Sequence, residues 1–323
     1  MKKKGLLLSL GLALSLLIPS LNAPQQVAEA ATAPANTVSY YMDTINTTTL
    51  YNMGYSLGTH DYNTSGTQKT LVVLAFGGQT SSYGGSLWGA ADASTSQIAA
   101  AAEEFSHGYW SGTRSDTGST VKLVIGTNNS YTVNYTAGQR WSQMINDIGA
   151  YNNSHSYSSQ VLLYGGNDME MSYDTPSATR SWVNGYASVD NYLYYNYGDA
   201  GGCTTSSTFS GTYNGSCNNG WTMNDIYYIS WGAAPGQSVP EIYNTSGANA
   251  RQWKNVKKYA RVTLGANMII SGAMTQYGAC VQNGGCSGTN NTPSAGWSQL
   301  YNALNSDADT AQGLAFSTDI KWH

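Results

Sequence analysis

The sequence predicts an α/β protein built as one (β/α)8 barrel of the TIM type, a single domain with two loop disulfides. Eight apolar runs of strand length recur over about 250 residues, the usual size of such a barrel. Most of these runs lead into helix-like segments. The runs are continuously apolar, which is typical of parallel strands buried on both faces. An open doubly wound sheet is the alternative fold.

The expected strands cover residues 70–76, 121–125, 160–164, 192–197, 225–231, 239–243, 267–275 and 313–318. The expected helices cover residues 94–105, 137–151, 175–189, 248–262 and about 296–304. Ser94 has the side chain of an N-cap, apolar residues recur at three-to-four spacing in 137–151, and Pro176 suits a first helical turn. After the fourth strand, a loop between Cys203 and Cys217 replaces the helix.

The N-terminus has the pattern of a signal peptide. Lys2 to Lys4 precede an apolar run over 6–18, which is shorter than the roughly 20 residues that span a bilayer. The small residues of Ala28-Glu29-Ala30 offer a cleavage site before Ala31, and an uncleaved membrane anchor is the alternative. We expect a signal peptide over 1–30, a polar N-terminal extension over 31–69 and the barrel over 70–323. The extension could add a strand or cover the bottom of the barrel.

The amino-acid composition limits the classes of partner that the chain could bind. Removing the three lysines and one glutamate of the leader takes the formal charge from −4 to −6. Such a chain lacks the clustered cations that nucleic acids require. The 25 tyrosines and 9 tryptophans suit stacking on sugar rings, although most aromatic residues serve as core or strand residues. We expect a secreted, extracellular monomer with no membrane contact after cleavage, and association with the cell wall is a further option.

Four cysteines in an exported chain predict two disulfides. Closeness in sequence favours Cys203 with Cys217 and Cys280 with Cys286, out of three possible pairings. Neither pair has the spacing of a zinc site with nearby histidines. We therefore expect no metal and no cofactor.

In a (β/α)8 barrel the active site lies at the carboxyl ends of the strands. The candidate catalytic residues at these ends are Glu170, Asp168, Asp199, Glu241 and Asp319. The candidate substrate-binding residues are Gln79, Asn128, Trp231 and Gln276. Because polar residues end strands in most proteins, that alternative accounts for about half of them.

The sharpest local pattern is Asp168-Met169-Glu170, directly after the third expected strand. In extended backbone, Asp168 and Glu170 point to the same side. Two close carboxyls cannot both ionise freely, so the pKa of one rises. The protonated carboxyl can donate to a glycosidic oxygen while its neighbour stays anionic. We assign Glu170 as the acid and Asp168 as the supporting carboxylate.

Two alternatives concern other chemistry. Asp168, Glu170 and Asp174 could instead bind Ca²⁺, although Asp174 could equally be a helix N-cap. Residues 54–58 match G-x-S-x-G and stand close to His60 and Asp61. A nucleophile elbow needs a hydrophobic strand before the serine and a helix after it, and neither is expected here.

Several segments resemble a group of secreted proteins from Gram-positive bacteria: residues 165–170, 195–203, 217–222, 230–232 and 240–243. The members of that group are uncharacterised and have a glycoside-hydrolase-like barrel, and the resemblance covers most of residues 70–320. It implies the fold but no particular activity.

The D-x-E strand end is also distantly similar to that of chitinase-like and lysozyme-like barrels. This similarity implies that Glu170 donates the proton and that Asp168 assists a substrate N-acetyl group or a charge. The full chitinase pattern D-x-x-D-x-D-x-E is absent, because Leu163 and Gly166 stand at two of its Asp positions. Peptidoglycan or another wall polysaccharide is therefore as good a candidate substrate as chitin.

Together these patterns favour a secreted glycoside hydrolase that acts on a cell-wall or environmental polysaccharide. The alternative is a non-catalytic carbohydrate- or wall-binding protein on the same barrel, because fold alone does not imply activity. A hydrolase needs a second carboxyl about 5–9.5 Å from Glu170.

Overall fold

A computed structural model describes residues 31–116 and 118–323, so the expected signal peptide lies outside the described residues. Eight parallel strands form one sheet in the order β6-β5-β4-β3-β2-β1-β8-β7. The strands are β1 (Asn36–Tyr41), β2 (Lys69–Gln79), β3 (Thr120–Tyr131), β4 (Val161–Asp168), β5 (Tyr194–Asn196), β6 (Gly236–Ser238), β7 (Gly272–Thr275) and β8 (Phe316–Trp322). A parallel bridge from Glu241 to Met274 links the segment after β6 to β7. The sheet is thus a nearly closed barrel, which confirms the predicted fold.

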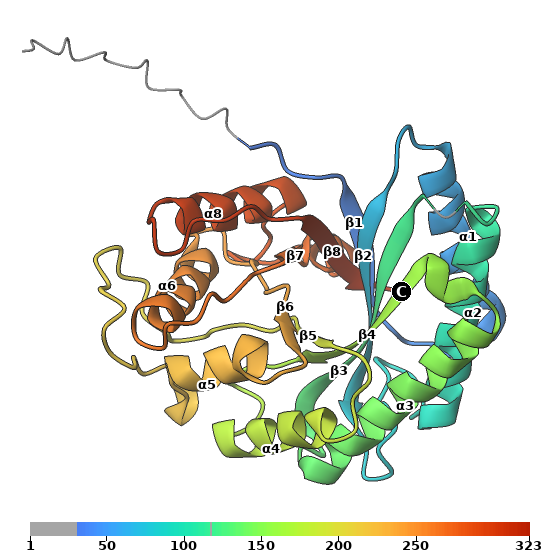
Figure 1. Ribbon diagram of the computed structural model, residues 1–323, viewed down its shortest axis with the longest axis horizontal. Coiled ribbons are helices and arrows are strands. Elements are labelled where there is room, and N and C mark those ends of the chain that lie inside the picture. The colour runs from blue at the N-terminus through green and yellow to red at the C-terminus, as the bar shows by residue number, and fades with distance from the viewer. Residues whose placement is uncertain (1–30, 117) are drawn as a thin grey trace, which may run out of the picture. The chain divides into compact units, whose positions relative to one another are not determined.

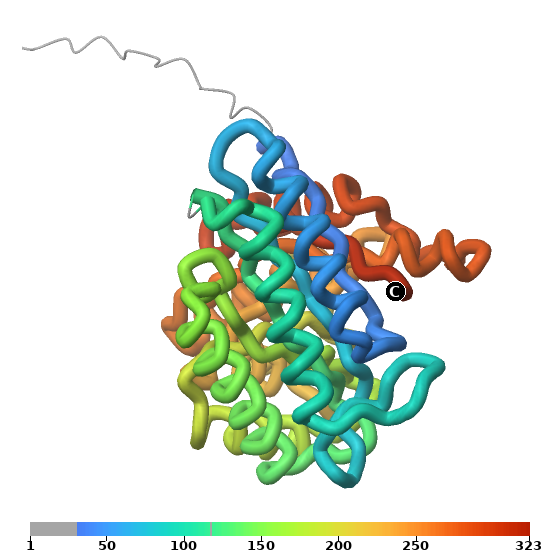
Figure 2. The backbone as a smooth tube through the Cα atoms, turned by 90° about the vertical axis from the view of Figure 1, so that its right-hand side faces the viewer, coloured from blue at the N-terminus to red at the C-terminus, as the bar shows by residue number. Residues whose placement is uncertain are grey.

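Helices surround the strands (Figure 1). They are α1 (Thr47–Asn63), α2 (Thr95–Gly112), α3 (Tyr135–Ser154), α4 (Pro176–Ala187), α5 (Met223–Tyr227), α6 (Ala248–Val262), α7 (Tyr277–Gln282) and α8 (Pro293–Asn305). Figure 2 shows α1, α2 and α3 side by side along one flank. Ser94 caps α2 with a capping box, and Pro176 and Pro293 occupy first turns after Thr175 and Thr292 caps. The start signals of α2 and α4 were recognised in the sequence. Helices were expected near the observed positions of α2, α3, α4, α6 and α8, but α1, α5 and α7 were not expected.

The first two helices pack backbone to backbone. A Cβ atom at Gly54 would lie 2.1 Å from the Phe105 carbonyl oxygen, and one at Gly108 would lie 2.0 Å from the Tyr51 carbonyl oxygen. Gly58 makes the same close approach one turn further along α1. The glycines of the G-x-S-x-G pattern are therefore helix-packing residues.

The barrel begins earlier than expected. Residues 31–69 contain β1 and α1, so they belong to the barrel and are not a separate extension. Strand β1 was missed because the polar Ser39 interrupts the apolar pattern expected of a barrel strand. The Ser39 side chain points into the barrel, where its hydroxyl lies 2.7 Å from that of Thr318.

The expected strand over 225–231 is wrong, because this segment is helical. Thr222 and Asp225 form a capping box that starts α5, and a π-helical turn follows over Tyr228–Gly232. Ile226 and Ile229 are buried at helical spacing, so the apolar run reads as a strand only by composition. Strand β6 follows at 236–238, immediately before the expected 239–243.

The core has two layers, one between strands and helices and one inside the barrel. Tyr197 fills the inner layer, and its hydroxyl donates to the Thr127 carbonyl at 2.7 Å. A Cβ atom at Gly126 would lie 2.3 Å from that hydroxyl oxygen, and one at Gly166 would lie 2.5 Å from a Val124 methyl. Glycine at both positions therefore makes room for the ring.

Disulfides join Cys203 to Cys217 and Cys280 to Cys286, as predicted. Among the helices that the structure describes, none is both long and apolar enough to cross a membrane.

Candidate functional site

Three carboxylates meet at the carboxyl end of the barrel. One oxygen from each of Asp168, Glu170 and Glu241 lies within 4.8 Å of the other two. Asp168 and Glu241 are 5% and 6% exposed, and Glu170 is half-buried. We call these three residues the carboxylate cluster. The structure thus brings together residues 71 positions apart in the chain, which the strand-end argument predicted.

Each carboxylate is positioned by the ends of neighbouring strands. Asp168 is the last residue of β4 and pairs in register with Asn128 of β3. The Glu241 amide donates to the Gly198 carbonyl at 3.1 Å, and the next amide donates to Met274 of β7 at 2.8 Å. Glu241 therefore stands in the gap between β6 and β7 where the sheet nearly closes.

Asn129 clamps the backbone of Glu170. Its Oδ1 accepts from the Glu170 amide at 2.8 Å, and its Nδ2 donates to the Glu170 carbonyl at 3.0 Å. The same Nδ2 donates to the Thr179 hydroxyl of α4 at 3.1 Å. Because Asn129 is fully buried, these bonds fix where Glu170 leaves the strand end.

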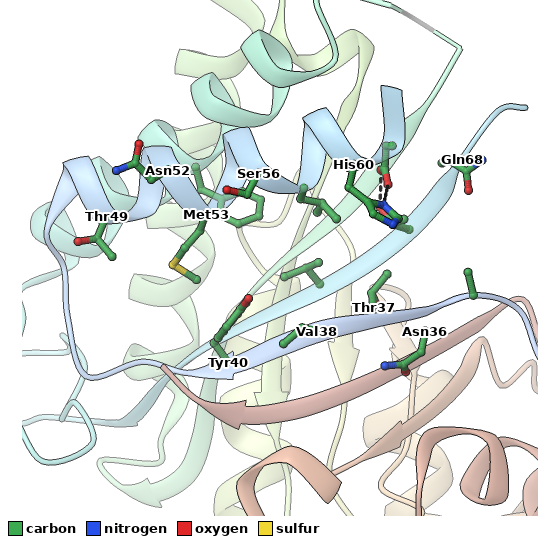
Figure 3. Close-up of a pocket in the computed structure, with 16 residues that line it drawn as sticks. Asn36, Thr37, Val38, Tyr40, Thr49, Asn52, Met53, Ser56, His60 and Gln68 are labelled. Atoms are coloured by element: carbon green, nitrogen blue, oxygen red, sulfur yellow. Dashed lines mark hydrogen bonds and ion pairs between the residues drawn. The ribbon is translucent and has the colours of Figure 1, made fainter. Parts of the chain in front are cut away.

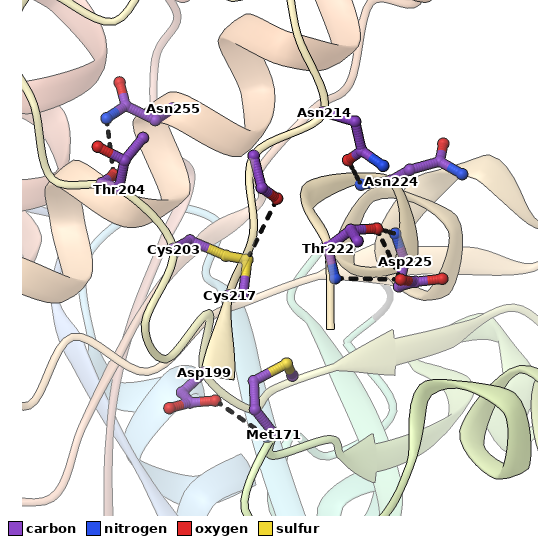
Figure 4. The surroundings of a disulfide bond; sticks show 11 residues. Met171, Asp199, Cys203, Thr204, Asn214, Cys217, Thr222, Asn224, Asp225 and Asn255 are labelled. Carbon is purple, nitrogen blue, oxygen red and sulfur yellow. Dashed lines mark hydrogen bonds between the residues drawn. A yellow bond between two sulfur atoms is a disulfide. The ribbon is translucent and has the colours of Figure 1, made fainter. Parts of the chain in front are cut away.

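Asp199 stands beside the cluster, four residues before Cys203 of the first disulfide (Figure 4). Its Oδ1 accepts from the Met171 amide at 3.4 Å. Directly after Cys217, Asn219 donates to the Met171 carbonyl at 2.8 Å, and Trp221 donates to the Asp174 carbonyl at 3.0 Å. The short segment that follows the Cys203–Cys217 disulfide therefore ties down the segment that follows Glu170.

Burial raises the pKa of every carboxyl in this group. The pKa values of Asp168 and Glu241 are well above their usual range, first because of burial. The charges of Glu170 and Asp199 raise the Asp168 pKa further, while a hydrogen bond with Glu241 lowers it. The charges of Asp168, Glu170 and Asp199 raise the Glu241 pKa further. Burial and the charge of Asp199 raise the Glu170 pKa, while hydrogen bonds from Ser172 and Tyr173 lower it. The cluster therefore retains protons to a higher pH than isolated carboxyls do.

Aromatic rings adjoin the cluster. The Tyr41 ring centroid lies 5.3 Å from that of Trp88 and 4.6 Å from that of Trp322, and the two indoles are 5.4 Å apart. We call these three residues the aromatic trio. The Tyr41 hydroxyl lies 3.4 Å from that of Tyr243, and the charge of Glu241 contributes to the raised pKa of Tyr243. The trio thus connects to the carboxylates through Tyr243.

The second disulfide loop holds the trio. Gln282, between Cys280 and Cys286, donates to the Trp322 carbonyl at 2.9 Å and accepts from the Trp322 amide at 2.8 Å. Within the part of the chain that the structure describes, the indole N–H groups of Trp88 and Trp322 and the Asp168 Oδ1 are buried without a hydrogen-bond partner. Because buried polar atoms are usually hydrogen-bonded, these three atoms keep the capacity to bind a ligand.

The other predicted residues have different positions. Asn128 is at the cluster, with Oδ1 bound by the Ser130 amide. The Gln79 amide group contacts Ala137 and Trp182 on the helix side of the sheet. Gln276 donates to the Thr289 carbonyl at 3.1 Å. Trp231 lies in the π-helical turn and packs against the outer core, because its expected strand is helical.

Asp319 also lies outside the cluster. Its Oδ1 accepts from the Tyr277 amide and the Thr275 hydroxyl, and its Oδ2 accepts from the Gly278 amide at 2.8 Å. Both oxygens are therefore engaged at the start of α7. Asn129 was recognised as a strand-end residue but was given no role, and no member of the trio was singled out. Tyr41 was missed because β1 was missed, and Trp322 because β8 extends beyond the expected end.

The carboxylate cluster has the donor set of a hard cation, because Ca²⁺ prefers several carboxylate oxygens. Glu241 takes the place that the sequence analysis gave to Asp174. The Asp174 Oδ1 instead accepts from the Thr175 amide at 2.6 Å, and Thr175 is the N-cap of α4.

Ser56 and Leu57 of the G-x-S-x-G pattern, with His60 and Asp61, line a separate cavity of about 540 Å³ between α1 and the outer faces of β1 and β2 (Figure 3). Ser56 sits in the middle of α1, which is not a strand-to-helix elbow. His60 Nδ1 lies 3.3 Å from Asp61 Oδ1, but no hydrogen bond joins Ser56 to His60 in this described helix. The cavity lies on the helix side of the sheet, away from the carboxylates.

No protein-family model matches the chain, and no curated protein is significantly similar to it. The barrel, its two disulfides and the strand-end geometry therefore carry the functional argument.

Proposed function

We propose that this protein is a secreted glycoside hydrolase that acts on a cell-wall or environmental polysaccharide. The observation that carries the proposal is the carboxylate cluster: three carboxyls with raised pKa values within 4.8 Å at the carboxyl end of the barrel. Glycoside hydrolases use a pair of carboxyls, one of which keeps its proton at neutral pH.

Glu170 is the general acid in this proposal, because it is the cluster member with the greatest access to solvent. Its proton passes to the glycosidic oxygen as the bond from that oxygen to the anomeric carbon breaks. Glu241, in its ionised form, is the second carboxylate and bonds to the anomeric carbon. Water then releases the sugar from Glu241 while Glu170 takes the proton of that water. Asp168 supports the positive charge that develops at the anomeric carbon.

The spacing favours retention of anomeric configuration. Retaining enzymes hold their two carboxyls about 5–5.5 Å apart, whereas inverting enzymes need about 6.5–9.5 Å to admit a water. The nearest oxygens of Glu170 and Glu241 lie within 4.8 Å, which is closer to the retaining than to the inverting range. The aromatic trio would stack on a sugar ring beside the cluster.

Secretion belongs to the same proposal. Two disulfides suit an oxidising compartment outside the cytoplasm, and the sequence of residues 1–30 has the pattern of a signal peptide.

The test is release of reducing sugar from peptidoglycan, chitin, and α- and β-glucans. The wild type should be active on at least one polymer, and Glu170→Gln should lose about 10²–10⁴-fold, the usual share of a general acid. Glu103→Gln, a carboxyl on α2 whose pKa is also raised by burial, is the matched control and should keep activity. The anomer formed first, followed by NMR, should retain the substrate configuration.

A second candidate function is non-catalytic carbohydrate binding. The near-complete burial of Asp168 and Glu241 favours it, because buried carboxyls can serve structure alone. Retention of a polymer in a pull-down, with no sugar released and no effect of Glu170→Gln, would overturn the hydrolase proposal and support this one.

A further inference from the structure

The carboxylates at the barrel end are not balanced by cations. Six ion pairs occur in residues 31–116 and 118–323, and none involves Asp168, Glu170, Asp199 or Glu241. Their negative charges repel one another, and burial removes the water that would screen the repulsion. A neutral ligand leaves this repulsion in place, whereas a positively charged ligand relieves it.

The aromatic trio offers a second, independent feature that suits a cation. Two indoles and a phenol ring lie with centroids 4.6–5.4 Å apart, and the two indoles meet at 70°. Ring faces attract ammonium groups, tryptophan most strongly, and ring clusters recognise amines in this way. Tyr41 belongs to this trio and also reaches Tyr243 beside Glu241, and the charges of Asp168 and Glu241 act on Tyr41, so rings and carboxylates are neighbours at this end of the barrel.

We propose that the polysaccharide recognised at this end of the barrel carries free amino groups, as polymers of glucosamine do. The inference rests on the proposed function for the sugar part of the ligand. The trio and the carboxylates contact the ammonium group, and N-acetylation removes the charge that both features attract. A divalent cation satisfies the carboxylates alone and makes no use of the rings.

The experiment compares the β-1,4-linked hexamers of glucosamine and N-acetylglucosamine by calorimetry at low salt and at a pH where the amine is charged. Binding is measured with Glu170→Gln, so that no turnover occurs. The glucosamine hexamer should bind at least tenfold more tightly, and 1 M NaCl should reduce the difference because salt screens charge. In the same background, Glu241→Gln should reduce the preference at least threefold.

General attraction of a polycation to an acidic protein is controlled by adding Glu103→Gln to the Glu170→Gln protein, because this removes one carboxylate on α2 outside the cluster. Equal loss from Glu103→Gln and Glu241→Gln would overturn the proposal, as would tighter binding of the acetylated hexamer. Ca²⁺ that binds this protein while the glucosamine hexamer does not would also overturn it.

Hydrolysis of the two hexamers by the wild type separates the two claims. An amine preference in binding without hydrolysis of any polymer contradicts only the proposed hydrolase. Hydrolysis confined to the acetylated hexamer, together with tighter binding of that hexamer, contradicts only the inference about amines.

Discussion

At the scale of single residues, the position of the acid depends on Asn129. Glu170 lies beyond the last residue of β4, where no ladder hydrogen bonds hold it. Both backbone groups of Glu170 bind the buried Asn129 side chain instead. Asn129 is therefore a positioning residue.

We predict that Asn129→Ala lowers kcat about 10–100-fold and changes KM little, because a misplaced acid affects proton transfer more than sugar binding. Asn129→Asp keeps the acceptor for the Glu170 amide and should restore part of kcat. The measurement is steady-state kinetics on the polymer that the wild type degrades, with circular dichroism to check the fold. An increase in KM at unchanged kcat would contradict the positioning role.

The neighbours of Glu170 predict pH shifts of opposite sign. Removing the charge of Asp199 lowers the Glu170 pKa, so Asp199→Asn should move the alkaline limb of kcat/KM to lower pH. Removing the Ser172 hydroxyl, which donates to Glu170 at 2.9 Å, raises the Glu170 pKa. Ser172→Ala should therefore move the same limb to higher pH. Shifts of the same sign in both variants would show that another group sets this limb.

The sequence predicted the carboxylates better than the other site residues. Asp168, Glu170 and Glu241 meet and Asp199 lies beside them, because the ends of parallel strands converge at one end of a barrel. Gln79 ends β2 and Asp319 lies in the middle of β8, and the side chains of both bind helix backbones on the outer face. Which face a terminal side chain takes depends on the register of the strand, which apolar composition does not specify.

At the scale of elements, the two disulfides lie next to contacts that hold different parts of the site. The segment directly after Cys217 binds the backbone after Glu170, and the loop closed by Cys280 and Cys286 binds Trp322. The spacing of the cysteines predicted the pairing but not these contacts, because both form between segments far apart in the chain.

The two disulfides should therefore affect different kinetic constants. Cys203→Ser/Cys217→Ser should mainly lower kcat, and Cys280→Ser/Cys286→Ser should mainly raise KM. For loops of 14 and 6 residues, chain entropy gives losses of stability of about 3 and about 2 kcal/mol, respectively. Kinetics below the Tm of both variants, with thermal unfolding measured alongside, check this prediction. Equal effects on both constants in both variants would contradict it.

The helices were predicted more accurately than the strands. Capping residues and prolines mark helix starts, whereas β5, β6 and β7 are only three or four residues long. Strands of this length are too short to show a recognisable apolar pattern. The apolar residues of α5 and its π-helical turn look more like a strand in the sequence than the residues of β6 do.

At the scale of the whole molecule, the carboxylate cluster lowers stability as pH rises. The pKa values of Asp168 and Glu241 are higher in the folded than in the unfolded chain, so folding binds protons. This contribution is complete below the ordinary carboxyl pKa and is lost as pH rises through the raised values.

We predict that Glu241→Gln raises Tm at neutral pH by about 2–4 °C, the shift that roughly 1 kcal/mol produces, and has a smaller effect in acid. The substitution removes a buried charge while keeping the shape of the side chain. Asp92→Asn, at an exposed position, is the control and should leave Tm unchanged at both pH values. A loss of Tm at neutral pH that is absent in acid would contradict the sign of this linkage.

The barrel as a whole was predictable, because repeated apolar strands must bury both of their faces. Helices cover the outer face, and the other strands cover the inner face. The closure was not predictable, because it depends on β1 with its inward polar Ser39 and on a single bridge from Glu241 to Met274. That bridge also places a catalytic candidate at the seam of the barrel.

The most direct test of the account is titration of the carboxyl groups of ¹³C-labelled Asp and Glu by NMR in the wild type and in Glu241→Gln. Among the 18 Asp and Glu residues of the chain, Asp168 and Glu241 should titrate above the ordinary range of about 3.9–4.3. The titration of Asp168 should change when Glu241 becomes neutral, because the groups are coupled. Titration of every carboxyl in the ordinary range, or an Asp168 signal that ignores the substitution, would contradict a coupled cluster at the end of the barrel.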